Sequence, residues 1–296
     1  MTGDMSSTDP HDHAVDEVCY RHPDRESGVS CQRCDRLICS ECRHQASVGV
    51  HCPECTKGTS QKVYNGNNLP GSQGLVTKTL VGANVAIFVV TILLLGSTLT
   101  GIGNEALREF GTFGPFIAEE GDWWRVISGG FLHSGLIHVG FNMYLLWQLG
   151  QQVEQVIGPK SFIAVYMAAL FGGSFGALLL APDVPVVGAS GAVFGLIGFT
   201  VLMFRSRGIG LFDTGLGFLI VINAIFSFRG GVSLGGHAGG FLIGLLLGAL
   251  FFGLNPGDAK PLGGDDKKQI AASIAIGAVS FAGALWAAST WANPLF

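Results

Sequence analysis

Charged residues are scarce in this chain of 296 residues, at 13%, whereas soluble domains carry about 25%. Cysteine is absent after Cys55, so the two parts of the chain differ in chemistry. The net charge of −4 argues against a nucleic-acid partner. No basic stretch followed by an apolar region and a cleavage site opens the chain, so we expect no secretory signal peptide. With 48% hydrophobic residues, the composition indicates an all-α, multi-pass membrane protein.

All seven cysteines lie near the N-terminus, and each belongs to a pair of ligands separated by two residues. The pairs are Cys19 with His22, Cys31 with Cys34, Cys39 with Cys42, and Cys52 with Cys55. Seven cysteines cannot all form disulfides within one chain, whereas His22 completes eight ligands for two tetrahedral zinc ions. Disulfides and a redox role are the alternatives. His51 is an alternative to Cys52 as a ligand.

The order of these ligands resembles that of a B-box-type cross-braced zinc finger. The resemblance implies that one zinc ion is held by Cys19, His22, Cys39 and Cys42, and the other by Cys31, Cys34, Cys52 and Cys55. Fully ligated zinc is structural, so we expect it to stabilise a small module and to take no part in catalysis. Reduced cysteines suit the cytoplasm. We expect the module to bind a protein partner; a folded cap is the alternative.

The composition changes along the chain predict four regions: a disordered N-terminus over 1–18, the zinc module over 19–57, a linker over 58–78 and a membrane domain over 79–296. A spanning helix needs about 20 mostly apolar residues. Seven stretches are predicted to span the bilayer: Leu80–Leu99, Gly135–Val156, Phe162–Leu180, Ala189–Phe204, Gly210–Phe228, Ser233–Phe252 and Ile270–Trp291. The positive residues of the short loops place the N-terminus in the cytoplasm and the C-terminus outside.

Four polar residues of the predicted spans share one depth near the outer surface. His138 and Asn142 are four residues apart and share a face of the second span, Ser190 begins the fourth, and His237 lies early in the sixth. Intramembrane ionisable residues mark functional sites, and glycines along the fourth and sixth spans allow close packing. Each residue alone has a structural alternative, as a packing serine or an interhelical hydrogen-bond donor. We interpret His133 as structural.

These residues resemble the motifs of the rhomboid intramembrane serine proteases. The matching pieces, in the family's order, are "WWR" with Trp124 and Arg125, "HVGFN" with His138 and Asn142, "GASG" with Ser190, and "GHAGG" with His237. The resemblance covers roughly residues 80–253. It implies a six-plus-one transmembrane helix bundle, here preceded by the zinc module.

The resemblance also assigns roles to the polar residues. It implies that Ser190 is the nucleophile and His237 the general base, while His138, Asn142 and the backbone N–H of Ser190 form the oxyanion hole. Catalysis of this kind needs no cofactor.

Three further expectations come from the resemblance. Trp124 and Arg125 order the loop after the first span. Phe194 stands where the family often has a tyrosine facing the catalytic histidine, so a hydroxyl contact is lost. The fifth span and the loop Arg229–Val232 form the lateral entrance for substrate.

The expected function is therefore cleavage of membrane-protein substrates in or near their transmembrane segments. We expect a multi-pass protein of the plasma membrane, in contact with the lipid bilayer, whose active site opens toward the outer side. The alternative is a catalytically inactive rhomboid-like protein that binds membrane clients. A transporter or channel, and a zinc module for which the membrane domain is only an anchor, are further alternatives.

Overall fold

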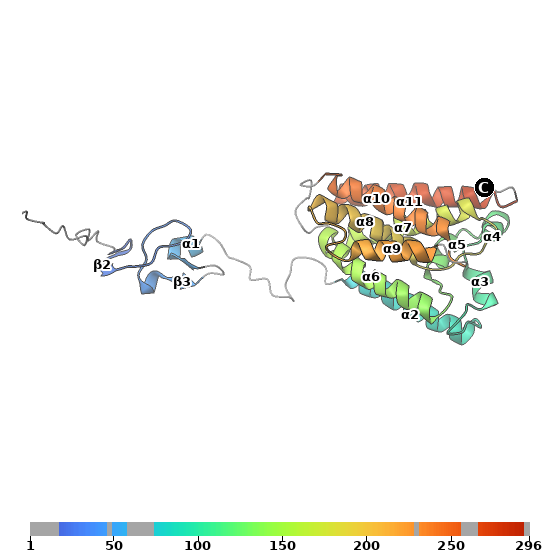
Figure 1. The fold of residues 1–296 in the computed structure, drawn as a ribbon, viewed down its shortest axis with the longest axis horizontal. Helices are drawn as coiled ribbons and strands as arrows, with labels where there is room; N and C mark the ends of the chain where they lie inside the picture. The colour runs from blue at the N-terminus through green and yellow to red at the C-terminus, as the bar shows by residue number, and fades with distance from the viewer. Residues whose placement is uncertain (1–17, 46–48, 58–73, 228–230, 256–265, 293–296) are drawn as a thin grey trace, which may run out of the picture. The chain divides into compact units, whose positions relative to one another are not determined.

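The computed structural model describes residues 18–45, 49–57, 74–227, 231–255 and 266–292 (Figure 1). The chain forms two compact units, Met1–Asn68 and Leu69–Phe296. The N-terminus over 1–17 and most of the predicted linker, residues 58–73, lie outside the described residues.

The first unit contains short strands and one short helix. Strand β1 (Val18–Cys19) pairs antiparallel with β2 (His22–Glu26), and β3 (His44–Gln45) pairs antiparallel with β4 (Val50–His51). A 3-10 turn, η1 (Ser40–Cys42), and helix α1 (Pro53–Lys57) complete it. Among its described residues, the buried hydrophobic cluster consists of five cysteines and Ile38. So small a core cannot stabilise a domain of this size without a further constraint.

The second unit is helical. Its long helices are α2 (Leu75–Leu94), α6 (Leu136–Ile157), α7 (Pro159–Leu180), α8 (Ser190–Ser206), α9 (Leu216–Ser227), α10 (Leu234–Phe252) and α11 (Lys267–Ala288). Between α2 and α6 lie the short helices α3 (Asn104–Phe110), α4 (Gly114–Glu119), α5 (Arg125–Ser128) and η2 (Gly129–Phe131). Helix α2 packs against α6, and α7 contacts α8, α10 and α11 (Figure 1).

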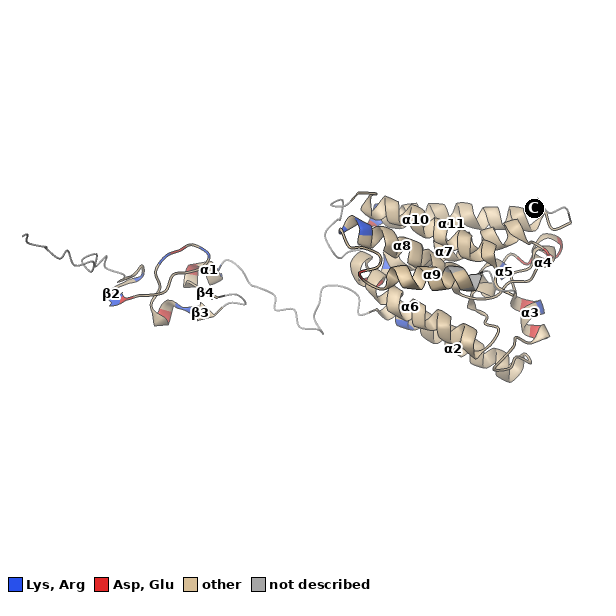
Figure 2. Ribbon diagram, in the orientation of Figure 1, with Lys and Arg blue, Asp and Glu red and all other residues tan. Residues whose placement is uncertain are grey.

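Each of the seven predicted spans contains a helix. Among the described residues, four helices are long and apolar enough to cross a membrane: α2, α7, α10 and α11. Helix α8 is apolar but shorter. Figure 2 shows the helices of this unit almost free of charge along their length, with charged residues gathered toward the two ends. The protein is therefore a helical, multi-pass membrane protein with a Cys/His-rich module before it.

The first span begins five residues earlier than predicted, inside the predicted linker. Helix α2 begins at Leu75 because a side chain from α6 completes its first turn. The buried carboxylate of Glu154 accepts hydrogen bonds from the backbone N–H of Val76 at 3.1 Å, and from the N–H and hydroxyl of Thr77 at 2.8 Å each. Free N–H groups at a helix start are stabilised by such an acceptor, and a negative charge there complements the helix dipole.

The fifth span is shorter than predicted. The sequence predicted a span over Gly210–Phe228, but α9 begins at Leu216. Before it, the Asp213 carboxylate accepts a hydrogen bond from Gly210 N–H at 3.1 Å, and Gly215 has a positive φ of 75°. The chain therefore turns before it becomes helical. The residues at 228–230, part of the predicted entrance, lie outside the described residues.

A line of glycines joins α8 to α10. A methyl group at Gly240 would lie 1.9 Å from the carbonyl oxygen of Gly191, and one at Gly244 would lie 1.9 Å from that of Gly195. These four residues form what we call the glycine seam. At Gly240 and Gly244 the backbone of α10 touches carbonyl oxygens of α8 directly, which only glycine permits at these two positions. The seam sets the separation of the two helices that carry Ser190 and His237.

Candidate active site

Helix α8 begins at Ser190. Its first internal hydrogen bond runs from Val193 N–H to the carbonyl of Ala189 at 3.0 Å. The N–H groups of Ser190 and the next two residues therefore have no partner inside the helix. Together with the positive end of the helix dipole, they favour negative charge at this point.

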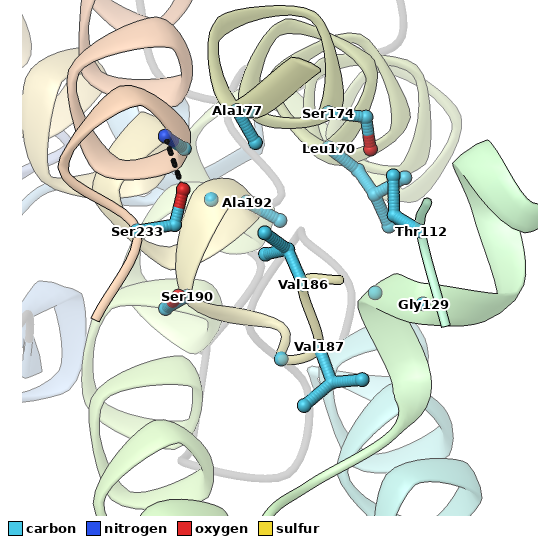
Figure 3. Close-up of a pocket in the computed structure, with 15 residues that line it drawn as sticks. Thr112, Gly129, Leu170, Ser174, Ala177, Val186, Val187, Ser190, Ala192 and Ser233 are labelled. Carbon is cyan, nitrogen blue, oxygen red and sulfur yellow. Dashed lines mark hydrogen bonds between the residues drawn. The ribbon is translucent and has the colours of Figure 1, made fainter. Parts of the chain in front are cut away.

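His237 lies over the face of α8 that begins with Ser190. Its ring stacks on that of Phe194, with centroids 3.9 Å apart and planes at 15°. Phe194 is four residues after Ser190, so both side chains occupy one face of α8. At the start of α10, Ser233 accepts a hydrogen bond from Gly236 N–H at 3.1 Å (Figure 3). This cap fixes the turn that carries His237. The structure thus brings the two predicted dyad residues to one helix face.

A small cavity of about 30 Å³ lies beside Ser190. Figure 3 shows Ser190 and Ser233 on one side of it, Thr112 and Gly129 on the other, and Val186 between. A space of this size accommodates a water molecule.

His138 faces Ser190 across Gly188. A methyl group on Gly188 would lie 2.8 Å from Nε2 of His138 and 3.6 Å from Oγ of Ser190. The same point is therefore close to both side chains, and only a glycine leaves it open. The contribution of His138 to an oxyanion hole stays a prediction.

Asn142 lies one turn below His138 in α6 and is buried. Its side-chain amide donates a hydrogen bond to the backbone carbonyl of His138 at 3.0 Å. An amide carries two hydrogens, so this bond uses one of them and fixes the side chain. The contribution of Asn142 to an oxyanion hole stays a prediction.

His133 is fully buried and packs edge-on against His138, with ring centroids 5.0 Å apart. Burial, together with the neighbouring His138, lowers the pKa of His133 to about 3. His133 is therefore neutral at physiological pH, and its position beside His138 fits the structural role expected for it.

Arg125 fastens the loop between α2 and α6. Its buried guanidinium bonds the carboxylate of Asp122 through Nε at 2.8 Å and Nη2 at 2.7 Å, and donates to the carbonyl of Arg108 at 2.5 Å. It also lies 4.6 Å from the ring centre of Phe116. The fork of an arginine suits several acceptors at once. Trp124, by contrast, is 42% exposed, whereas Arg125 is 4% exposed.

The same loop is bonded to the segment that leads into α8. Thr112 and Val186 exchange backbone hydrogen bonds of 3.0 and 2.9 Å, and Gly188 N–H donates to the carbonyl of Gly129 at 2.9 Å. The hydroxyl of Thr112 in turn donates to the carbonyl of Arg125 at 2.8 Å. The predicted loop residue Arg125 is thus connected to Gly188 through a short run of hydrogen bonds.

Sequence reasoning missed three supporting residues. Asp122 bonds Arg125, Glu154 bonds the start of α2, and Ser134 bonds His138. Two of these had a signal. Asp122 lies three residues before Arg125, at the spacing of an ion pair within one turn. Glu154 is a carboxylate inside an apolar span, which is costly without a partner.

Known proteins are similar in sequence to the part of this chain that contains these residues. A family model described as the Rhomboid domain matches residues 120–254. The putative rhomboid protease YdcA of Bacillus subtilis (strain 168) is 35% identical over 135 residues, which cover 43% of this chain and 68% of YdcA. This chain belongs to the rhomboid family.

Two other rhomboid relatives differ in the activity that their names state. Rhomboid protease GluP of the same bacterium is 33% identical over 182 residues, covering 60% of this chain and 35% of GluP. Inactive RHOMBOID-like protein 8 of Arabidopsis thaliana is 31% identical over 111 residues, covering 38% of this chain and 31% of that protein. This rhomboid thus spans about a third of either relative, and relatives named as proteases place it in a family of intramembrane proteases.

The N-terminal unit of this rhomboid gathers its cysteines and His22 into two groups, in the interleaved arrangement that the B-box resemblance implied. One group is Cys19, His22, Cys39 and Cys42, and the other is Cys31, Cys34, Cys52 and Cys55. The ligand atoms of each group lie within 4.8 Å of one another. All seven cysteines are free thiols in this structure. His51 lies opposite His44 in the pairing of β3 with β4. The second group contains Cys52 and not His51.

The distances suit a tetrahedral ion. Sulfurs bound to one zinc at about 2.3 Å are about 3.8 Å apart, and a sulfur and a nitrogen about 3.5 Å. Sγ of Cys34 and of Cys52 lie 3.8 Å apart, and Nδ1 of His22 lies 3.4 Å from Sγ of both Cys39 and Cys42. The donor set of each group therefore fits a structural zinc ion.

Two cysteines in each group have a lowered pKa, Cys19 and Cys39 in one and Cys31 and Cys52 in the other, which favours their thiolate forms. Burial raises the pKa of Cys19 and of Cys31, but hydrogen bonds from backbone N–H groups outweigh it and lower each pKa to about 6. For Cys31 the first of these donors is the N–H of Cys52, at 3.2 Å from Sγ. A thiolate is the form that binds a metal, so the backbone prepares both groups for a cation.

Proposed function

We propose that this rhomboid is an intramembrane serine endopeptidase in which Ser190 is the nucleophile and His237 the general base. The observation that carries the proposal is the stacking of His237 on Phe194, which holds the imidazole over the helix face headed by Ser190. A serine beside a positioned imidazole is the arrangement used for acyl transfer. Relatives named as proteases support the same reaction class.

In the proposed reaction, Oγ of Ser190 attacks the scissile carbonyl while His237 takes the hydroxyl proton. His237 then gives this proton to the leaving amine, and water releases the acyl-enzyme. The oxyanion forms beside the first N–H groups of α8 and Nε2 of His138, with Asn142 as a further donor. Such donors act most strongly where charge develops.

Arg125 and Trp124 are proposed to act on the loop rather than on the substrate. The hydrogen bonds from Arg125 through Thr112 to Val186 support this for Arg125. The lateral entrance is proposed to involve α9. A bond engineered between α9 and α6 is expected to block cleavage, and unchanged cleavage would contradict this entrance.

The substrates are proposed to be membrane proteins cut in or near a transmembrane segment, where the strand to be cut must leave the helical state. The N-terminus is proposed to lie in the cytoplasm and the site to open toward the outer side of the plasma membrane. Charged residues at the two ends of the helices support a spanning orientation (Figure 2).

The N-terminal module is proposed to hold two structural zinc ions and to bind a protein partner. When bound, zinc links ligands that are distant in sequence and supplies folding energy. The module is proposed to have no part in catalysis.

The test is cleavage of a transmembrane model substrate by purified protein in liposomes, beside Ser190→Ala and His237→Ala. Both variants are expected to lose cleavage, and Ser280→Ala, a serine of α11, to keep it. If either dyad variant cleaves like the unaltered protein, the dyad assignment is wrong.

The inactive relative favours one alternative, a rhomboid that binds membrane clients without cutting them. Labelling with a fluorophosphonate distinguishes the two, because this reagent reacts with an activated serine and needs no natural substrate. Labelling that disappears in Ser190→Ala supports the protease. Absence of labelling and of cleavage in folded protein supports the client-binding function.

A further inference from the structure

Ser134 makes two contacts with one nitrogen of His138. Its backbone nitrogen lies 3.3 Å from Nδ1, and its hydroxyl oxygen lies 3.0 Å from the same atom. A backbone N–H can only donate a hydrogen bond, so Nδ1 must be the acceptor. In a neutral imidazole one nitrogen accepts and the other carries the proton. The contacts therefore place the proton of His138 on Nε2.

The protonated nitrogen lies on the edge of the ring, with Cε1, that is near the candidate nucleophile. A single point, the position of a methyl group on Gly188, lies 2.8 Å from Nε2 of His138 and 3.6 Å from Oγ of Ser190. We propose that Ser134 is a positioning residue that keeps His138 in the Nε2-protonated form, so that its N–H points at the developing oxyanion. This inference rests on the proposed function of Ser190.

The local backbone explains how Ser134 reaches His138. Gly135 has a φ of 143°, which favours glycine, and the next N–H, of Leu136, donates to the carbonyl of Leu99 at 2.7 Å. The chain turns at this point, and Ser134 lies over the first turn of α6. His133 packs against the ring of His138 as well. The imidazole is thus held by contacts with both residues before the turn.

The contribution of Ser134 is expected to be smaller than that of His138 itself. Removal of a single oxyanion donor lowers kcat by about 10²- to 10³-fold, which is the expectation for His138→Ala. Ser134→Ala removes the hydroxyl but keeps the backbone N–H. One net hydrogen bond changes an equilibrium by about 2- to 12-fold, so kcat is expected to fall by that factor. KM is expected to stay unchanged, because the bond acts on a group that serves the transition state.

The experiment compares Ser134→Ala and Ser134→Thr with the unaltered protein in liposomes. Ser128→Ala is the matched control, because Ser128 is a nearby serine whose hydroxyl donates to the carbonyl of Phe110 at 2.7 Å. Threonine keeps the hydroxyl and is expected to restore kcat. The control is expected to change neither kcat nor KM. An unchanged kcat in Ser134→Ala, or a loss that threonine does not restore, overturns the proposal.

A second measurement does not depend on cleavage. The ¹⁵N NMR signals of ring-labelled histidine report which nitrogen carries the proton, and His138→Gln identifies the signals of His138. We expect the Nε2-protonated form in the unaltered protein and a mixture of both forms in Ser134→Ala. Equal populations of the two forms in both proteins overturn the role of Ser134. If the protein fails to cleave but the NMR result is as expected, the proposed function fails and the positioning of His138 stands.

Discussion

The glycine seam allows a sharp test of how helix packing controls the site. The perturbation is Gly240→Ala, which adds one methyl group to α10, three residues after His237. That methyl group would lie 1.9 Å from the carbonyl oxygen of Gly191, the residue after Ser190, whereas an ordinary contact begins at 3.4 Å. Neither atom belongs to a flexible side chain, so α8 and α10 would have to separate by roughly 1.5 Å, since packed interiors have little free space.

Two effects of different size follow from this separation. Overpacking costs about 1–3 kcal/mol, and the higher helix propensity of alanine offsets about 1 kcal/mol of it, so the loss of stability is modest. The rate of cleavage should fall further, because a misplacement of about 1 Å in a catalytic group can lower the rate about 100-fold. Gly240→Ala is therefore expected to stay folded and to lose about 100-fold in kcat.

The assay is cleavage of the model substrate in liposomes, with unfolding followed separately in mixed detergent. Gly82→Ala is the matched control, because Gly82 is also a helical glycine but has no atom within 4 Å of the added methyl group. The control is expected to cleave like the unaltered protein. A folded Gly240→Ala that keeps more than half of the rate would refute the idea that the seam fixes the separation of Ser190 and His237.

Four other predictions follow from contacts described above. Glu154→Gln should lower the free energy of unfolding by about 1.5–3 kcal/mol, since hydrogen bonds to a charge are lost; the exposed Glu119→Gln is the control, and equal denaturation midpoints would contradict the cap. Arg125→Lys should make the loop between α2 and α6 more sensitive to limited proteolysis, because an ammonium cannot replace the guanidinium fork; an unchanged digestion pattern would argue against this. Phe194→Ala should lower kcat by about 2- to 12-fold, the value of a ring contact, while Phe194→Tyr keeps the rate. Purified protein should release two zinc ions per chain on chelation, as followed with a zinc-sensitive dye, and Cys31→Ser should release one; a ratio of one in the unaltered protein would contradict the second site.

The sequence predicted which polar residues lie near one another better than it predicted the helix ends, while their catalytic roles stay predictions. Ser190 and His237 could be found because polar residues stand out in apolar spans, and spacing placed His138 and Asn142 on one face. The start of α2 could not be found in the same way. It depends on Glu154, which is distant in sequence. The hydropathy of neighbouring residues cannot predict a contact of this kind.

The contact between Ser134 and His138 could not be predicted from the sequence for a related reason. Ser134 is an ordinary serine in a turn, and only the positive φ of Gly135 brings its hydroxyl to Nδ1 of His138. The members of the two Cys/His groups could be predicted because their spacing is local within each pair. Which pairs share an ion came only from the resemblance, since spacing alone does not determine it.

The glycine seam also has a genetic consequence. Glycine is the one amino acid without a β-carbon, so every missense change at the seam adds an atom in a crowded place: at Gly240 or Gly244 it would lie 1.9 Å from a carbonyl oxygen of α8, at Gly195 2.2 Å from Cβ of Ala169 in α7, and at Gly191 3.0 Å from Cα of Gly173 in α7. No conservative replacement exists at these codons. Elsewhere in the bundle an exposed leucine can become valine or isoleucine at little cost. Inherited variation in this gene should therefore spread over the lipid-facing sides of the helices and leave the seam unchanged.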